Sequence, residues 1–224
     1  MLERLTDPRN AAIAKPNAHA LDLLDRVLAR EPAPVICEVG VGIGATTVEL
    51  CRKLENRGRI LLFDFEDRLT DLGADLAGLG FTNVELHANT RRRHDSYNWS
   101  LATILQARRQ AGEPPGLFDF VFLDGGHAFH HDAPAAMILK ELLKPGGLML
   151  LDDYDWSFAV SPTMNPQKNP DIRLEYTDAQ IETPHVRLIC DLFFDHDPDY
   201  RKVEIGYRVP FEHRRAYQKA PFDG

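Results

Sequence analysis

Short apolar runs alternate with segments of helical periodicity along about the first 150 residues of the chain. Continuous apolar runs are typical of strands that are buried on both faces of a sheet. The segments between them repeat apolar residues every three or four positions, as an amphipathic helix does. The predicted strands cover residues 35–39, 60–63, 84–87, 118–123 and 148–151. The predicted helices cover residues 17–30, 45–54, 69–79, 100–110 and 133–143.

The pattern changes after Asp155. Residues 157–170 carry three prolines and no clear period, so an irregular excursion is expected over about 157–176, placed to act as a lid. A helix over residues 178–194 follows, with Pro184 near its start. Residues 202–209 predict a strand, and a second strand before Ala220 would complete an antiparallel hairpin. The alternation of strands and helices predicts a doubly wound α/β sheet.

Composition narrows the class of protein. The 224 residues suffice for one substantial core, so a single domain over residues 1–224 is expected. The formal net charge of −8 argues against a partner that is a nucleic acid or a membrane surface. No apolar run approaches the roughly 18 residues of a membrane span, and the first residues lack a signal core. The three cysteines show no metal-ligand spacing and are expected to be reduced, in a cytoplasmic protein.

A glycine-rich loop joins the first predicted strand to the next helix. It reads Glu38-Val39-Gly40-Val41-Gly42-Ile43-Gly44, and its glycines allow a tight turn and close approach of the backbone to a ligand. Asp64 lies 20 residues beyond Gly44, at a strand end where a carboxylate can hold ribose hydroxyls. Glu66 is the alternative acid. The loop predicts a nucleotide-containing cofactor.

The loop by itself does not identify the cofactor. Gly40-x-Gly42-x-x-Ala45 also fits the dinucleotide fingerprint, so an NAD-dependent oxidoreductase is one alternative. That enzyme would need a second nucleotide-binding half and a recognisable proton donor, and the sequence offers neither. A cofactor-binding partner of another protein, without activity of its own, is a further alternative.

Two motifs resemble those of the class I S-adenosylmethionine-dependent methyltransferases. They are Glu38 ahead of the glycines, and Leu143-Lys144-Pro145-Gly146-Gly147 before the fifth strand. The resemblance spans roughly residues 17–209. It implies a Rossmann-like, doubly wound, seven-stranded α/β sheet, mostly parallel with the last strand antiparallel. It also implies that residues 38–44 hold the methionine part of S-adenosyl-L-methionine, Asp64 the ribose, and Asn89 the adenine.

Carboxylates follow the fourth and fifth predicted strands. Asp124 ends one strand, and Asp152 and Asp153 end the other. If these strands are neighbours, about 4.8 Å apart, the three acids share a small volume and repel one another unless a cation lies between them. Mg²⁺ prefers such oxygen ligands. The alternative is that these acids cap helices or order the cofactor loop without a metal.

The acidic set is similar to that of the metal-dependent O-methyltransferases of the catechol and macrocin types. Leu151-Asp152-Asp153-Tyr154 is closest to the macrocin-like group, which implies a sugar or natural-product hydroxyl as acceptor and Asp124, Asp152 and Asp153 as metal ligands. Where that group places a second acid as the proposed base, this chain has Gly126. His127 is the nearest replacement and the candidate general base. A metal-independent methyltransferase acting on nitrogen or a carboxyl group is the alternative.

The acceptor has two further candidate sets of contacts. The run Arg91-Arg92-Arg93-His94 is either a solvated charge run or a recognition site for an acidic or phosphorylated acceptor. An aromatic wall would draw on Trp99, Tyr154, Trp156 and Phe158. A homodimer is a further expectation, with residues 1–16 as an N-terminal arm that could serve it.

Overall fold

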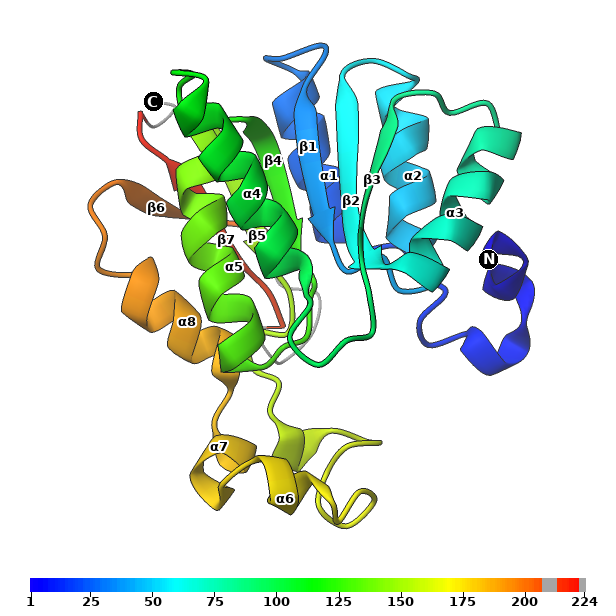
Figure 1. Ribbon diagram of the computed structural model, residues 1–224, viewed down its shortest axis with the longest axis vertical. Helices are drawn as coiled ribbons and strands as arrows, with labels where there is room; N and C mark the ends of the chain where they lie inside the picture. Colours follow the sequence, from blue (N-terminus) through cyan, green and yellow to red (C-terminus); the bar gives the residue numbers. More distant parts are fainter. Residues whose placement is uncertain (207–212, 222–224) are drawn as a thin grey trace.

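The apolar runs form the centre of a seven-stranded sheet (Figure 1). The computed structural model describes residues 1–206 and 213–221. The sheet has the order β3-β2-β1-β4-β5-β7-β6, and β1 to β5 are parallel. Strand β7 is antiparallel to both of its neighbours, β5 and β6. The strands are β1 Val35–Val39, β2 Arg59–Phe65, β3 Val84–Asn89, β4 Phe118–Leu123, β5 Leu143–Leu151, β6 Tyr200–Val203 and β7 Arg215–Lys219. The predicted fold class is confirmed.

The strand order reverses direction at β1, which pairs with β2 on one side and with β4 on the other. The chain continues from β1 to β2 in one half of the sheet and from β4 to β5 in the other half. A crevice therefore opens beyond the carboxyl ends of β1 and β4. Side chains alternate between the two faces of β1. Ile36 packs in one hydrophobic core, whereas Cys37 and Val39 pack in the other.

Helices cover both faces of the sheet (Figure 1). One core includes buried residues of the first three helices, and the other includes buried residues of α4, α5 and α8. These helices are α1 Ala18–Leu28, α2 Ala45–Leu54, α3 Glu66–Gly78, α4 Tyr97–Gln110, α5 Phe129–Leu142 and α8 His185–Phe193. No helix in the described part of the chain is long and apolar enough to cross a membrane.

Two sequence expectations near the end of the chain were wrong in their extent. The helix predicted over 178–194 is two helices, α7 Asp178–Glu182 and α8 His185–Phe193. Thr183 has extended backbone angles because it precedes Pro184, and α8 begins after this proline. The strand predicted over 202–209 is β6, which starts at Tyr200 and ends at Val203. Residues 207–209 lie outside the described residues.

The excursion after β5 carries its own small apolar cluster. It contains the 3₁₀ turn η3 Phe158–Val160 and the short helix α6 Ile172–Glu175. Phe158, Ile172 and Ile181 pack with Ala128, which precedes α5. Figure 1 shows α6 and α7 beyond the edge of the sheet at which the parallel strands end. At the other end of the chain, residues 1–16 form the 3₁₀ turns η1 Leu2–Thr6 and η2 Pro8–Asn10.

Candidate active site

A cavity of about 300 Å³ occupies the crevice beyond β1, β2 and β4. Its lining comes from the ends of four neighbouring strands and the loops that follow them. Among the lining residues are Gly40, Gly42, Asp64, Asn89, Tyr97, Asp124 and His127. Six predicted site residues therefore line one cavity, together with Gly125 and Gly126, which follow Asp124 in the chain.

At Gly40 the glycine loop lies so close to the end of β4 that only glycine fits. Gly40 has φ +86°, and a Cβ atom there would lie 1.8 Å from the carbonyl oxygen of Asp124. Gly44 has φ +87° and is the N-cap residue of α2. The loop thus brings its backbone to the cavity while α2 directs free N–H groups toward the same region.

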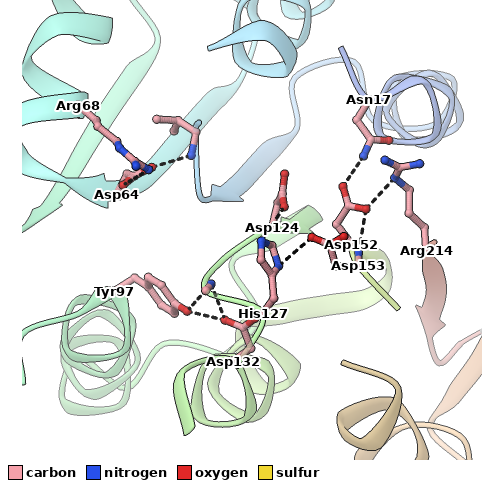
Figure 2. Close-up of polar contacts among 12 residues, drawn as sticks. Asn17, Asp64, Arg68, Tyr97, Asp124, His127, Asp132, Asp152, Asp153 and Arg214 are labelled. Atoms are coloured by element: carbon pink, nitrogen blue, oxygen red, sulfur yellow. Dashed lines mark hydrogen bonds and ion pairs between the residues drawn. The ribbon is translucent and has the colours of Figure 1, made fainter. Parts of the chain in front are cut away.

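Asp64 is buried at the end of β2 and faces the glycine loop (Figure 2). Its Oδ2 accepts a hydrogen bond of 3.0 Å from the backbone N–H of Val41, and its Oδ1 accepts one of 2.6 Å from Phe65 N–H. The guanidinium of Arg68 lies 3.4 Å from both oxygens and also lines the cavity. Asp64 is therefore held rigidly at the cavity wall.

Two buried oxygens near the glycine loop lack a partner within the described residues. They are Oε2 of Glu38 and Oδ1 of Asn89. Glu38 is almost fully buried below the loop, and burial raises its pKa to about 8. Asn89 ends β3 and lines the cavity. Unpaired buried polar atoms are costly, so both positions suit a ligand that donates hydrogen bonds.

Asp124, His127 and Asp153 converge beside the cavity (Figure 2). Nδ1 of His127 lies 3.1 Å from Oδ2 of Asp153, and Nε2 of His127 lies 3.9 Å from Oδ1 of Asp124. One potential ligand atom from each of the three lies within 4.8 Å of the others. His127 and Asp153 have φ of +54° and +56°, a left-handed conformation that is uncommon for residues other than glycine. Such backbone is often found where a functional side chain is positioned.

Asp152 faces a different set of partners. Its Oδ2 accepts a hydrogen bond of 2.9 Å from Nδ2 of Asn17, and its Oδ1 lies 2.9 Å from Nε of Arg214 (Figure 2). Asn17 is the N-cap residue of α1, and Arg214 immediately precedes β7. Of the three predicted metal ligands, the structure brings Asp124 and Asp153 together with His127, and it turns Asp152 toward α1 and β7.

The electrostatics of the site favour a cation. Burial raises the pKa of Asp124, and the negative charges of Asp152 and Asp153 raise it further. Burial also raises the pKa of Asp152, while the positive charge of Arg214 opposes this rise. Among the described residues, no positively charged side chain lies within hydrogen-bond distance of Asp124, and Nε2 of His127 is 3.9 Å from its Oδ1.

A tyrosine and an aspartate hold the loop between Asp124 and His127. The hydroxyl of Tyr97 donates to Oδ1 of Asp132, and the backbone N–H of Gly126 lies 3.2 Å from both oxygens. A Cβ atom on Gly125 would lie 2.6 Å from the Asp132 oxygen. Sequence reasoning missed Tyr97, Asp132, Arg68, Asn17 and Arg214. Only Asn17 carried a local signal, as an amide residue before a predicted helix.

The predicted aromatic wall is realised only in part. Trp156 contacts His127 edge-on, with ring centroids 5.7 Å apart, and Phe158 lies next to Trp156 at 5.0 Å. Trp99 is exposed on α4, whereas Tyr154 is buried beneath the guanidinium of Arg215. The wall beside the site therefore comes from Trp156 and the excursion that follows it.

The chain is similar to known methyltransferases in sequence and in fold. Residues 37–154, more than half of the chain, match the family described as the methyltransferase domain. No curated protein matches the chain in a sequence comparison. Solved structures of the same fold include a candidate caffeoyl-CoA O-methyltransferase from Staphylococcus aureus, with 15% identity and a TM-score of 0.62. That alignment covers 97% of this chain and 91% of the other.

Two more structures share the fold. TomG from Streptomyces achromogenes, an O-methyltransferase of tomaymycin synthesis in complex with S-adenosylmethionine, is 20% identical, with a TM-score of 0.55 over 90% of this chain and 79% of that one. An O-methyltransferase from Bacillus cereus in complex with S-adenosylhomocysteine is 16% identical, with a TM-score of 0.56 over 98% of this chain and 100% of that one. The chain belongs to the methyltransferase domain family, and the predicted class I S-adenosylmethionine-dependent methyltransferase is confirmed.

Proposed function

We propose that this enzyme methylates a hydroxyl oxygen of a small molecule, of the sugar or natural-product kind, with the help of a divalent cation such as Mg²⁺. The convergence of Asp124, His127 and Asp153 beside the cofactor cavity carries the proposal. Two neighbours of the same fold are described as O-methyltransferases, which supports oxygen as the acceptor atom.

The cavity offers a contact for each part of the cofactor. The loop Gly40–Gly44 would hold the methionine part, with the unpaired Oε2 of Glu38 as an acceptor for its ammonium group. Asp64 would hold the ribose hydroxyls, and the unpaired Oδ1 of Asn89 would accept from the adenine amino group. The cofactor supplies an activated methyl group, so the protein has to hold the acceptor oxygen in line and remove its proton.

His127 is the group placed to remove that proton. Its Nδ1 lies at hydrogen-bond distance from Asp153, so we assign the Nδ1 proton to this contact. The Nε2 lone pair then remains for the hydroxyl proton of the acceptor. Asp153 would orient the ring and stabilise the imidazolium that forms. Trp156, packed against the ring, would help to fix its orientation.

Asp124 and Asp153 are the carboxylates best placed to hold the cation. A divalent ion there would relieve the repulsion between the acids and polarise the acceptor hydroxyl. Asp152 would instead anchor the segment, since Asn17 and Arg214 already engage both of its oxygens. His127 is close enough to serve as a third ligand, in competition with its role as base.

Calorimetric titration after treatment with EDTA tests the proposal. S-adenosylhomocysteine is expected to bind without metal, and Mg²⁺ or Mn²⁺ to give a separate heat. Asp124→Asn and Asp153→Asn should abolish the metal heat, while the matched variant Asp152→Asn should retain it. Loss in Asp152→Asn as well as in the other two variants would favour the ligand set predicted from the sequence. The absence of any metal heat would favour metal-independent transfer to nitrogen or a carboxyl group.

The cytoplasmic location, the homodimer and the closure of the excursion over the site stay predictions. The arm at residues 1–16 contacts its own chain, since Leu2 N–H donates to Oδ2 of Asp75 on α3. Gel filtration with light scattering would measure the oligomeric state.

A further inference from the structure

A second cavity, of about 420 Å³, lies next to the cofactor cavity. We call it the basic cavity, and it is lined by Arg93, His94, Ser96, Asn98, His130 and His131. Ser96 and His131 line both cavities, so the two spaces adjoin. The lining comes from the segment between β3 and α4, from α4 itself and from the first turn of α5.

The charge of the basic cavity is opposite to that of the whole chain. Its lining has one arginine, three histidines and no carboxylate, although the chain carries a net charge of −8. The nearest carboxylates in sequence are already engaged. Asp95 accepts from the backbone N–H and hydroxyl of Thr90, and Asp132 accepts from Tyr97. Within residues 1–206 and 213–221, Arg93 has no ion-pair partner, whereas Arg91 is paired with Asp67.

A line of aromatic rings leads from the basic cavity to the reaction centre. The ring of His130 lies 5.9 Å from that of Tyr176, and Tyr176 lies 4.4 Å from Phe158. Phe158 lies 5.0 Å from Trp156, and Trp156 lies 5.7 Å from His127. Three of these rings belong to the segment around and within the excursion, beyond the edge of the sheet (Figure 1). Phe158 is buried and supports the partly buried rings of Tyr176 and Trp156, which give an acceptor an apolar surface between the basic cavity and the candidate base.

We propose that the basic cavity binds an anionic group, a phosphate or a carboxylate, of the methyl acceptor. This inference rests on the proposed function and specifies its substrate class. The apolar body of the acceptor lies along the partly buried rings of Tyr176 and Trp156, which pack on the buried Phe158, and its hydroxyl faces His127. The planar guanidinium of Arg93 can donate two hydrogen bonds to such a group, and the imidazoles add donors around it.

Calorimetry with inorganic phosphate and phenyl phosphate tests the inference. The full chain is saturated with S-adenosylhomocysteine, and EDTA is present so that no metal at Asp124 and Asp153 captures the phosphate. Arg93→Gln is expected to weaken both probes about tenfold, because it removes a charge-assisted contact. Arg92→Gln is the matched control, an exposed neighbouring arginine outside the cavity lining, and should change the affinity by less than about twofold.

The aromatic surface predicts a second result in the same titrations. Phenyl phosphate should bind about fivefold more tightly than inorganic phosphate, and Tyr176→Leu should remove most of this difference without changing the affinity for inorganic phosphate. Equal affinities for the two probes, or equal effects of Arg92→Gln and Arg93→Gln, would overturn the inference. A chain that binds S-adenosylhomocysteine but neither probe overturns the inference and leaves the proposed function intact. A chain that does not bind S-adenosylhomocysteine overturns the proposed function, and with it the acceptor role of the cavity.

Discussion

Nδ1 of His127 lies 3.1 Å from Oδ2 of Asp153, and each residue has a left-handed backbone conformation. One residue follows β4 and the other follows β5, so the contact joins the ends of two neighbouring strands. A strained backbone at both partners fixes the pair in a geometry that relaxed loops would not favour. The pair is therefore the element of the site whose alteration is most informative.

His127→Gln tests the role of the base. The variant keeps a polar side chain but cannot accept the hydroxyl proton, so we expect methyl transfer to fall about 10²- to 10⁴-fold. The assay would follow transfer of labelled methyl from S-adenosylmethionine to hydroxylated acceptors. Affinity for S-adenosylhomocysteine should change little. His196→Gln, at an exposed histidine on the loop before β6, is the control, and a fall of similar size there would contradict the assignment.

Asp64→Asn tests the ribose contact. Loss of the carboxylate should weaken S-adenosylhomocysteine about 10- to 100-fold, as expected for a hydrogen bond to a charged group. The matched change is Asp67→Asn. Asp67 lies three residues after Asp64, and its exposed carboxylate is paired with Arg91. Calorimetry of both variants gives the comparison. Unchanged affinity in Asp64→Asn would mean that the ribose lies elsewhere.

Gly40→Ala tests the close approach of the glycine loop to β4. The new methyl group would overlap the carbonyl oxygen of Asp124, which belongs to the backbone and cannot rotate away. We expect the free energy of unfolding to fall by about 2–4 kcal/mol. Gly112→Ala is the control, because Gly112 also has positive φ but a Cβ atom there meets nothing within 4 Å. Urea denaturation should show a loss of only about 1 kcal/mol in the control, and similar losses in both variants would exclude the overlap as the cause.

The buried carboxyl group of Glu38 should make the free energy of unfolding depend on pH. Burial raises its pKa from the unfolded value of 4.5 to about 8, so the folded state holds a proton that the unfolded state releases. The corresponding stability is present below pH 4.5 and is lost as the pH rises toward 8. Glu38→Gln should remove this loss, so the variant gains stability relative to the natural chain between pH 6 and pH 9. Denaturation curves of the variant and of the natural chain at pH 6 and at pH 9 measure this gain. A stability difference between the two proteins that is the same at both pH values would contradict a protonated Glu38.

Cofactor binding should act on the same proton. If the ammonium group of S-adenosylhomocysteine contacts Oε2 of Glu38, the ionised carboxylate is favoured and its proton is released. Titrations at pH 7 in buffers of different ionisation enthalpy would then show proton release, which Glu38→Gln should abolish.

Local patterns were sufficient for the framework of the fold. The first five strands and the helices between them were found because a buried parallel strand is apolar throughout and a covering helix repeats its apolar face. Errors arose where the pattern was ambiguous. Pro184 was placed near the start of one long helix, but it separates α7 from α8 because it constrains the residue before it.

The position of the glycine loop beside Asp64 was also predictable, because the loop follows β1 and Asp64 lies near the end of the adjacent strand β2, where it accepts from Val41 N–H. The sequence could not distinguish the roles of Asp152 and Asp153. Consecutive residues point in opposite directions, and which one faces His127 and Asp124 depends on the turn at Asp153 and on partners far away in the sequence. Asn17 lies 135 residues from Asp152, and only the folded chain brings them within 2.9 Å.

The sequence by itself determined the doubly wound sheet, the glycine loop and the strand ends at which the candidate site lies, because each depends on periodicity or short spacing. The tertiary structure decided which side chains face one another there. It paired His127 with Asp153, turned Asp152 toward Asn17 and Arg214, and brought Tyr176 against His130 and Trp156 against His127. These arrangements rest on contacts between segments remote in sequence, which no local pattern encodes.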